Sequence, residues 1–371
     1  MHLHRVKYKD IEQLPNLQIK KDFKKDFQGS SPSIFIGKLW SKGKFGIGTI
    51  ASMRYGLVNS RAKWNVKEVH KQNRLLDICK EVGMASNSVE LEVNLKEQPK
   101  LNLQPEKEII PFGPQGEVRK ARVTANPTVD SRVERIVSDT DLKAVEGVLS
   151  LYRKGFEENF LTKLLSSGSM GLEANRKLVP TRWSITAVDD TIGKKLITTV
   201  KDFPTGEFQV YFGGEWGNYY LILFFPEVWS FELFEMYLEH KLNPWSKAGN
   251  FYSTDYEDYS GRKNYAEECA GGYYACRLGV LDKLNELKRQ GSVLVFRFIT
   301  PEYNVPLGVW VCREATRKSM NEKPLTFGSQ ELMLKYAKEF IKNKFGFELE
   351  QLLKESKLLK EKKVQRRLSE F

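Results

Sequence analysis

The chain has 371 residues, of which 41% are hydrophobic and 12% aromatic, so it is long enough for two or three domains and too rich in core-forming residues for wholesale disorder. Its longest strongly apolar run, residues 219–225, is far shorter than the roughly 20 residues that cross a bilayer, which excludes a membrane-spanning helix. The net charge of +12 favours nucleic acid, an anionic membrane or an acidic protein as partner, without choosing among them.

Cysteines and histidines are sparse. The four cysteines, Cys79, Cys269, Cys276 and Cys312, form no C-x-x-C pair, and two of the four histidines stand at the extreme N-terminus. We therefore predict neither a disulfide framework nor a zinc site, and we expect a reducing, cytoplasmic setting.

In the first half of the chain, hydrophobic spacing predicts helices and strands after a basic, polar segment at residues 1–32. The expected elements are, in order, a helix over 61–82, a half-buried strand over 88–95, a helix capped by 138–141 that runs toward 152, a helix ending at 166–168, a strand over 183–188, and a helix from 189 to about 200.

The second half favours a sheet with covering helices. Glycine-rich residues 213–218 predict a hairpin between strands over 207–212 and 219–225. The further elements are an acidic, tyrosine-rich loop over 254–263, a helix over 265–289, strands over 292–299 and 307–312, and helices over 329–343 and 347–360. Strands and helices intermix without a regular β-α-β order, so we predict an α+β fold with mixed, mainly antiparallel sheets and packed helices.

Residues 176–190 (RKLVPTRWSITAVDD) hold the densest set of functional side chains. Cations suit phosphates, an aromatic ring suits a base, and carboxylates suit acid–base chemistry. The candidates are Arg176, Lys177, Arg182, Trp183 and Ser184 for nucleic acid, and Arg182, Asp189 and Asp190 for catalysis. The alternative interpretation, which we favour slightly, is a core strand with Trp183 buried and an aspartate capping the next helix.

Three weaker segments have structural alternatives too. Tyr273, Tyr274 and Arg277 follow paired glycines and have the chemistry to stack on a ligand, although core packing is the more frequent role. The small-residue loop 166–171 can cradle a phosphate or simply end a helix. Asp255 and Glu257 are a weak magnesium candidate, because an acidic run is more often solvated surface.

Residues 365–371 read QRRLSEF, which fits the Gln-x-x-Leu-x-x-Phe pattern of peptides that bind the PCNA sliding clamp. In one turn of 3₁₀ helix, positions three apart eclipse, so Leu368 and Phe371 would project together as a plug beside Gln365. We expect residues 361–371 to be detachable and residues 354–363 to be a charged helix end or tether. The alternative is an amphipathic helix end packed on its own protein.

The chain resembles the archaeal Nre family of DNA repair proteins. The residues that carry the resemblance are 35–37 (FIG), 138–144 (SDTDLKA), 176–190, 261–262, 265–266, 271–278 (GGYYACRL), 308–310 and 313–314. It implies an N-terminal family domain over 33–258, a C-terminal one over 259–358, and a basic tail over 359–371 with the clamp-binding motif. The cysteine-rich zinc motif of some members is missing before Cys79, so no metal site is carried over.

The resulting expectation is a DNA damage repair protein that binds DNA and docks on the clamp. One alternative is an enzyme acting on damaged DNA or a nucleotide, with residues 176–190 in its site; another is a non-catalytic repair scaffold. We also expect a functional cleft between the two family domains, bordered by residues 176–190 and 271–277.

Overall fold

The structure is a computed structural model that describes residues 10–11, 18–20, 57–61, 64–87, 89, 91–98, 115–238, 251–303 and 308–364. The chain divides into two compact units. Unit 1 consists of Met1–Ile192 and Val305–Trp310, and unit 2 consists of Gly193–Asn304 and Val311–Phe371.

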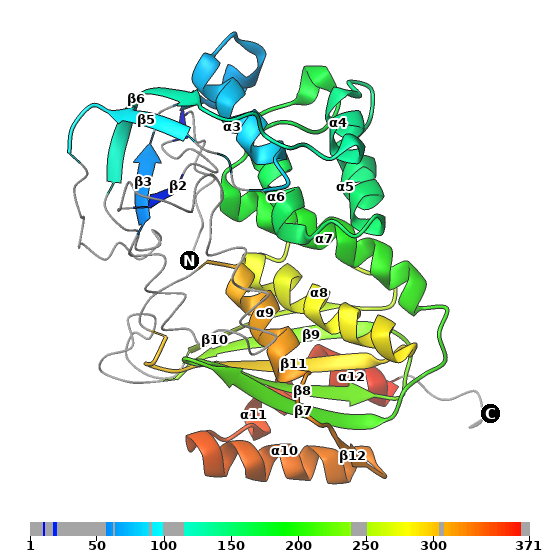
Figure 1. Ribbon diagram of the computed structural model, residues 1–371. Coiled ribbons are helices and arrows are strands. Elements are labelled where there is room, and N and C mark those ends of the chain that lie inside the picture. Colours follow the sequence, from blue (N-terminus) through cyan, green and yellow to red (C-terminus); the bar gives the residue numbers. More distant parts are fainter. Residues whose placement is uncertain are drawn as a thin grey trace. The chain divides into compact units, whose positions relative to one another are not determined.

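Unit 1 combines a small sheet with a group of helices (Figure 1). The four strands of this sheet run in the order β2-β3-β6-β5, with β3 parallel to β6 and the other pairs antiparallel, and two further strands form a separate antiparallel pair. The strands are β1 (Asp10–Ile11), which pairs with β4 (Trp64–Asn65), then β2 (Gln18–Lys20), β3 (Leu57–Arg61), β5 (Leu91–Leu95) and β6 (Gln115–Val123). The helices are η1 (Val66–His70), α3 (Arg74–Met84), α4 (Ser131–Ser138), α5 (Ala144–Arg153), α6 (Glu158–Ser166), η2 (Glu173–Asn175) and the first part of α7 (Thr181–Val200).

Helix α3 builds one core of unit 1. Asn73 caps its start, because the side-chain oxygen accepts hydrogen bonds from the amides of Leu75 and Leu76. Its apolar side then packs on β6, burying Leu76, Cys79 and Val82 together with Val118 and Ala121 of the strand, among others.

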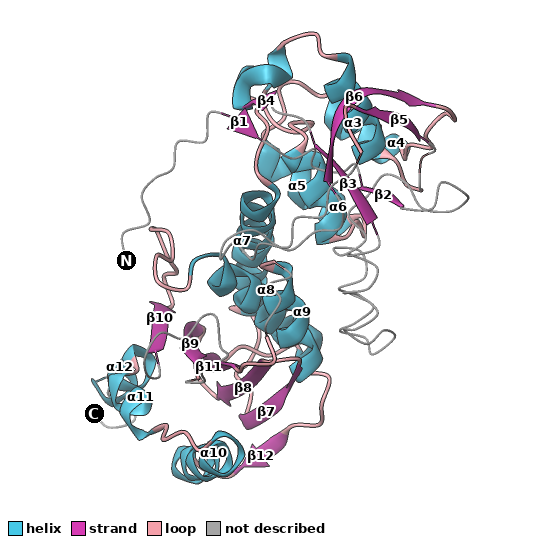
Figure 2. Cartoon of the chain, turned by 90° about the vertical axis from the view of Figure 1, so that its left-hand side faces the viewer, coloured by secondary structure: helices cyan, strands magenta, loops and turns pink. Residues whose placement is uncertain are grey.

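Unit 2 is a six-stranded sheet between two layers of helices (Figure 2). The strand order is β10-β9-β11-β8-β7-β12, and only the β9–β11 pair is parallel among these strands. The strands are β7 (Phe208–Glu215), β8 (Asn218–Phe225), β9 (Ser230–Tyr237), β10 (Phe251–Glu257), β11 (Ser292–Ile299) and β12 (Leu325–Phe327). The helices are α8 (Ala270–Leu287) and α9 (Trp310–Ser319) on one face, and α10 (Gln330–Phe345), α11 (Glu350–Glu355) and α12 (Lys357–Val364) on the other.

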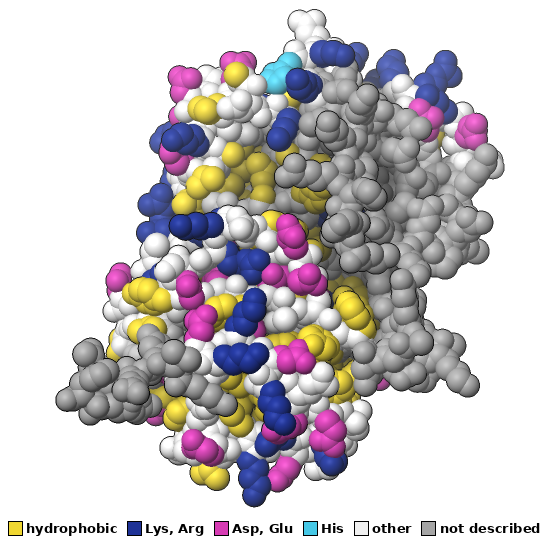
Figure 3. All heavy atoms as spheres, turned by 180° about the vertical axis from the view of Figure 1, so that it is seen from behind, with side chains coloured by type: hydrophobic (Ala, Val, Ile, Leu, Met, Phe, Trp, Pro, Cys, Tyr) yellow, Lys and Arg dark blue, Asp and Glu magenta, His cyan; other side chains and the backbone are white. Residues whose placement is uncertain are grey.

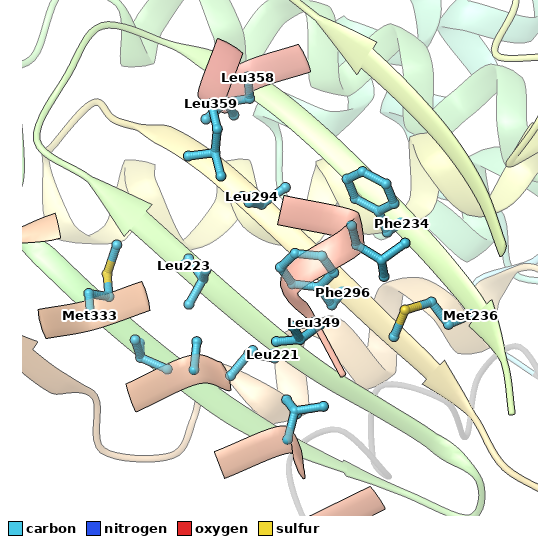
Figure 4. Close-up of a cluster of buried hydrophobic side chains, with 14 of the residues drawn as sticks. Leu221, Leu223, Phe234, Met236, Leu294, Phe296, Met333, Leu349, Leu358 and Leu359 are labelled. Atoms are coloured by element: carbon cyan, nitrogen blue, oxygen red, sulfur yellow. The ribbon is translucent and has the colours of Figure 1, made fainter. Parts of the chain in front are cut away.

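Alternate side chains of the central strands enter the core under α10, α11 and α12 (Figure 4). Leu221 and Leu223 of β8 and Leu294 and Phe296 of β11 are fully buried there. Leu358 and Leu359 of α12 close the same cluster and are 1% and 6% exposed. The last described helix is therefore part of the core.

A buried carboxylate fixes the start of α12. Glu232 of β9 accepts hydrogen bonds from the hydroxyl of Ser356 (2.5 Å) and from the backbone amides of Lys357 (3.0 Å) and Leu358 (3.1 Å). These donors occupy both of its oxygens and satisfy amides that a helix N-terminus leaves without partners.

Much of the predicted architecture is confirmed. The fold is α+β with mixed, mainly antiparallel strands. The 207–225 hairpin, the strand over 292–299, the helix stop at 166–168 and the alternating strand near 88–95 are all present, although β5 begins only at Leu91. Among the described residues of the predicted 61–82 helix, those at 66–70 and from 74 on are helical, and α3 continues to Met84.

Three predicted elements are wrong. Residues 183–188 lie inside helix α7 instead of forming a strand, because their buried positions continue at helical spacing through Ile192 to Val200. The strand predicted over 307–312 is replaced by the start of α9. Residues 254–257 belong to strand β10, because their alternate polar side chains have buried partners.

The tail also needs a correction. Of the two alternatives for residues 354–363, the charged helix end is confirmed and the tether is wrong, since all of them except Ser356 belong to α11 or α12, and α12 runs on to Val364. The detachable segment was expected from residue 361, but residues 361–364 are helical. Gln365, Leu368 and Phe371 lie outside the described residues, as does the 35–38 segment. Among the described helices, none is long and apolar enough to cross a membrane.

A half-buried cation, Lys163, makes the stability of unit 1 depend on pH. Burial lowers the pKa of Lys163 to about 8, and its ammonium group lies 4.9 Å from the centroid of the Phe160 ring. Below pH 8 the folded protein holds a poorly solvated charge, so the free energy of unfolding should rise as the pH rises from about 8 to the ordinary lysine value. Lys163→Met should raise the free energy of unfolding at pH 7 by on the order of 1–3 kcal/mol and abolish this rise. Urea unfolding of the wild type and of Lys163→Met from pH 7 to 10 measures the free energy of unfolding. If the two curves of this free energy against pH ran parallel, the prediction would be wrong.

Candidate functional site

The Arg176 side chain forms hydrogen bonds within unit 1. Its guanidinium donates hydrogen bonds to the carbonyl oxygens of Gly171 (2.8 Å), Val137 (2.9 Å) and Asp139 (3.1 Å). These bonds tie the segment before α7 to the end of α4. Arg176 is therefore a structural staple, and the expectation that it holds a phosphate is not supported by its contacts.

The small-residue loop 166–171 is a helix stop. The amides of Ser167, Gly168 and Ser169 donate to carbonyl groups of α6, and Gly168 has a φ of 69°. Ser167 and Ser169 are buried. Since these amides already have acceptors, the loop does not form a phosphate cradle.

The start of α7 is where the predicted site residues reach the surface. Lys177, in the loop before the helix, is exposed, as are Arg182 and Trp183 in its first turn. The indole of Trp183 is 49% exposed, whereas Trp229 and Trp310 are buried. This segment therefore places two exposed cations next to a half-exposed tryptophan in the chain.

The remaining candidates within residues 176–190 are buried or half-buried. Ser184 is fully buried, and its hydroxyl donates to the carbonyl oxygen of Val179 (3.4 Å). The prediction that Ser184 contacts nucleic acid is therefore wrong. Asp189 is fully buried and Asp190 half-buried, in the middle of α7 and not at a cap. Arg182 is exposed in the first turn of α7, whereas Asp189 is fully buried seven positions later, about 10 Å along the helix axis.

Tyr273, Tyr274 and Arg277 lie inside unit 2, in a charged layer between α8 and the sheet. They are 0%, 5% and 1% exposed. Arg277 donates to the Glu257 carboxylate at 2.7 Å, and its guanidinium carbon lies 5.6 and 5.3 Å from the centroids of the two tyrosine rings. The expectation that these three residues stack on nucleic acid is therefore wrong for this structure, because they are buried and pack against each other, with the two rings edge to face at 82°.

A second ion pair explains one of the paired glycines. Glu235 of β9 binds Arg297 of β11 at 2.7 Å, and Arg297 also donates to the side-chain oxygen of Asn218 (3.2 and 2.5 Å). A Cβ added to Gly272 would lie 2.5 Å from a carboxylate oxygen of Glu235. Glycine lets α8 approach the pair this closely.

The magnesium candidates belong to the same layer. Asp255 accepts hydrogen bonds from the amides of Glu268 (3.1 Å) and Cys269 (2.8 Å) and binds Arg262 at 2.9 Å. Glu257 is the partner of Arg277. Each carboxylate thus already has a guanidinium, and no group of three or more metal-ligating side chains occurs within the described ranges.

Burial also changes the acidity of the layer. It raises the pKa of Tyr273 well above 10, and the nearby Glu257 carboxylate adds to the effect. Burial likewise raises the pKa of the thiols of Cys269 and Cys276. Groups with these shifts stay neutral near pH 7 and are poor nucleophiles there.

Comparison with known proteins decides the family. Residues 37–246 match the family model described as archaeal Nre, N-terminal, and residues 257–371 match the one described as archaeal Nre, C-terminal. The chain belongs to the archaeal Nre family.

Two relatives illustrate the level of similarity. DNA repair protein NreA of Haloferax volcanii is 34% identical over 323 residues, covering 78% of this chain and 77% of the relative. DNA repair protein NreB of Archaeoglobus fulgidus is 30% identical over 352 residues, covering 87% of each chain. No solved structure shows significant similarity to this member of the Nre family.

The two Nre models and the two compact units divide the chain at different places. The models meet between residues 246 and 257, while the units divide at residue 192 within α7. The sheet of unit 2 therefore takes β7, β8 and β9 from the N-terminal Nre segment and β11 and β12 from the C-terminal one, while β10 falls between the two matches except for Glu257.

Sequence reasoning missed most of the buried charges. Glu232 and Glu235 stand in the apolar run SFELFEMY, and Arg297 stands in SVLVFRFI. A single charge inside a strand that is otherwise buried is the available signal, because such charges are almost never buried without partners. The sequence does not reveal which charges pair, since Glu235 and Arg297 are 62 positions apart.

Breaking the Arg277–Glu257 pair tests the charged layer. Arg277→Met should lower the free energy of unfolding by about 3–5 kcal/mol, because it leaves Glu257 buried without its counter-charge. The double variant Arg277→Met/Glu257→Leu should recover much of that loss. The matched control is Lys338→Met, which breaks the exposed Lys338–Glu350 pair (3.0 Å) and should cost about 1 kcal/mol or less. Urea unfolding measures all three, and equal effects of Arg277→Met and Lys338→Met would contradict the account.

Proposed function

We propose that this Nre protein is a DNA repair protein that contacts nucleic acid with the start of α7 and docks on the PCNA sliding clamp through Gln365, Leu368 and Phe371. The repair role is supported by family membership and by relatives that carry the name DNA repair protein. The proposed roles of the chain are thus to bind nucleic acid and to attach to the clamp.

The exposed ring of Trp183 is the observation that carries the nucleic-acid contact. A large ring that is half exposed beside Arg182 and Lys177 gives an unpaired base a stacking surface and its phosphates two cations. On the face shown in Figure 3, basic and acidic side chains are interspersed, so the positive net charge does not by itself define a binding surface there. An exposed ring next to two cations at the start of α7 is a more specific indication of nucleic-acid binding than the net charge of the chain.

The clamp contact is supported by the spacing of three residues. Gln365, Leu368 and Phe371 match the Gln-x-x-Leu-x-x-Phe pattern, and they follow a helix that is packed in the core up to Leu359.

Nucleic-acid binding should depend on Trp183 and on salt. Trp183→Ala should weaken binding of a single-stranded oligonucleotide roughly tenfold, because stacking contributes about 1–3 kcal/mol per base. Arg182→Ala should weaken it too and reduce the slope of log affinity against log salt by about one. Fluorescence anisotropy from 50 to 300 mM salt measures both effects. Phe251→Ala, at a ring that is 56% exposed in unit 2, is the control. Binding that ignores ionic strength, or equal losses in the control, would sink this part of the proposal.

Clamp binding should depend on the two apolar anchors. Leu368→Ala/Phe371→Ala should weaken binding to the clamp encoded by the same genome roughly a hundredfold, because each anchor contributes on the order of 1.5–3 kcal/mol by burial. Isothermal calorimetry with the full chain measures the change. The control is Leu332→Ala/Phe251→Ala, which removes an exposed leucine and an exposed phenylalanine from the folded body. Unchanged affinity in the anchor variant would show that the tail pattern is a coincidence.

A further inference from the structure

Helix α12 is held on the sheet almost to its last residue. The Glu232 cap fixes its start, and Leu358 and Leu359 are buried in the core. Near its end, Lys362 forms an ion pair with Glu227 at 3.0 Å, and its ammonium lies 3.3 Å from the centroid of the Phe225 ring. The base of the clamp-binding segment is therefore attached to the body of unit 2.

This attachment leaves very little tether. Gln365 is the third residue after Lys362, and the seven residues 365–371 span at most about 25 Å when fully extended. A receptor of ordinary domain size is more than about 30 Å across. A clamp that takes Leu368 and Phe371 into one pocket must therefore bring the surface around that pocket against unit 2.

The surface beside this exit point has a defined chemistry. Val228 is 46% exposed and follows Glu227, the partner of Lys362. Lys357 and Lys360 are exposed on α12, and Lys360 stands only about 6 Å along the helix from Val364. Lys362 is engaged with Glu227, and the exposed carboxylate of Glu361 accepts a hydrogen bond from the Tyr256 hydroxyl (2.5 Å). The apolar spot and the two lysines are the further exposed groups that a receptor can meet there.

We infer that the sliding clamp, once it holds the tail, also contacts a second surface of unit 2 formed by Val228, Lys357 and Lys360, which we call the exit surface. The inference rests on the proposed clamp docking and adds a partner surface to it. The matching region of the clamp is an apolar spot with carboxylates close to the pocket that receives Leu368 and Phe371. The lysines then act on the rate and salt dependence of association, and Val228 acts on the lifetime of the complex.

The test compares the full chain with a synthetic peptide of residues 363–371, both titrated into the clamp by calorimetry. The full chain should bind at least about fivefold more tightly than the peptide, because only the chain carries the exit surface. Val228→Asp and Lys357→Glu/Lys360→Glu should each reduce the affinity of the full chain about fivefold, toward that of the peptide.

Matched controls separate this effect from general damage. Val145→Asp changes another exposed valine, 54% exposed in unit 1, and Lys335→Glu changes an exposed lysine on α10; neither should alter the affinity. Equal affinity of chain and peptide, with no effect of Val228→Asp, would overturn the exit surface and leave the tail contact intact. An anchor variant that binds like the wild type would instead overturn the clamp docking itself.

Discussion

The contact between the Glu232 carboxylate and the N-terminus of α12 determines how the end of the described chain is organised. A fully buried carboxylate is costly unless every oxygen has donors, and here a hydroxyl and two helix amides supply them. Burial raises the pKa of Glu232, while the three hydrogen bonds act in the opposite direction. The donors come from residues 356–358 and the acceptor from the second strand of the sheet, so this contact joins the helix before the tail to the centre of unit 2.

On the other face of the same sheet, arginine side chains supply the donors for the buried carboxylates. The Arg277–Glu257 and Arg297–Glu235 pairs lie under α8, and their guanidinium groups also contact tyrosine rings or an amide oxygen. The motif GGYYACRL, which helps to carry the resemblance to the Nre family, supplies Arg277, both tyrosines and the glycine that faces Glu235. This motif is therefore part of the scaffold, whereas Lys177, Arg182 and Trp183 at the start of α7 are exposed.

The sequence predicts those parts of the fold in which local pattern and burial agree. The 213–218 turn lies between two apolar strands, and Gly168 ends a helix in the left-handed conformation that glycine favours. The sequence predicts the second part of α7, from residue 189 on, but not its first part, because Trp183–Val188 is rich in residues that favour strands and the helical spacing becomes clear only over twenty residues. The site residues were harder to assign, because an arginine beside two tyrosines has the same composition in a ligand site and in a buried ion pair. Only the distant partner Glu257, twenty positions away, distinguishes the two.

Hydrogen exchange at α12 tests the central claim, that Glu232 locks the base of the tail to the body. In the wild type, the amides of residues 359–364 should exchange orders of magnitude more slowly than in an unstructured chain, because Leu358 and Leu359 are buried and the helix start is capped. Glu232→Gln replaces one carboxylate oxygen by an NH₂ group, which then faces the hydrogen-bond donors at the start of α12. The substitution should therefore abolish the protection of residues 359–364, while the amides of α8 still exchange slowly. Tyr256→Phe, which removes only the exposed hydrogen bond to Glu361 (2.5 Å), is the control and should leave the protection of α12 nearly intact. Fast exchange of these amides in the wild type, or equal protection in Glu232→Gln, would contradict the account.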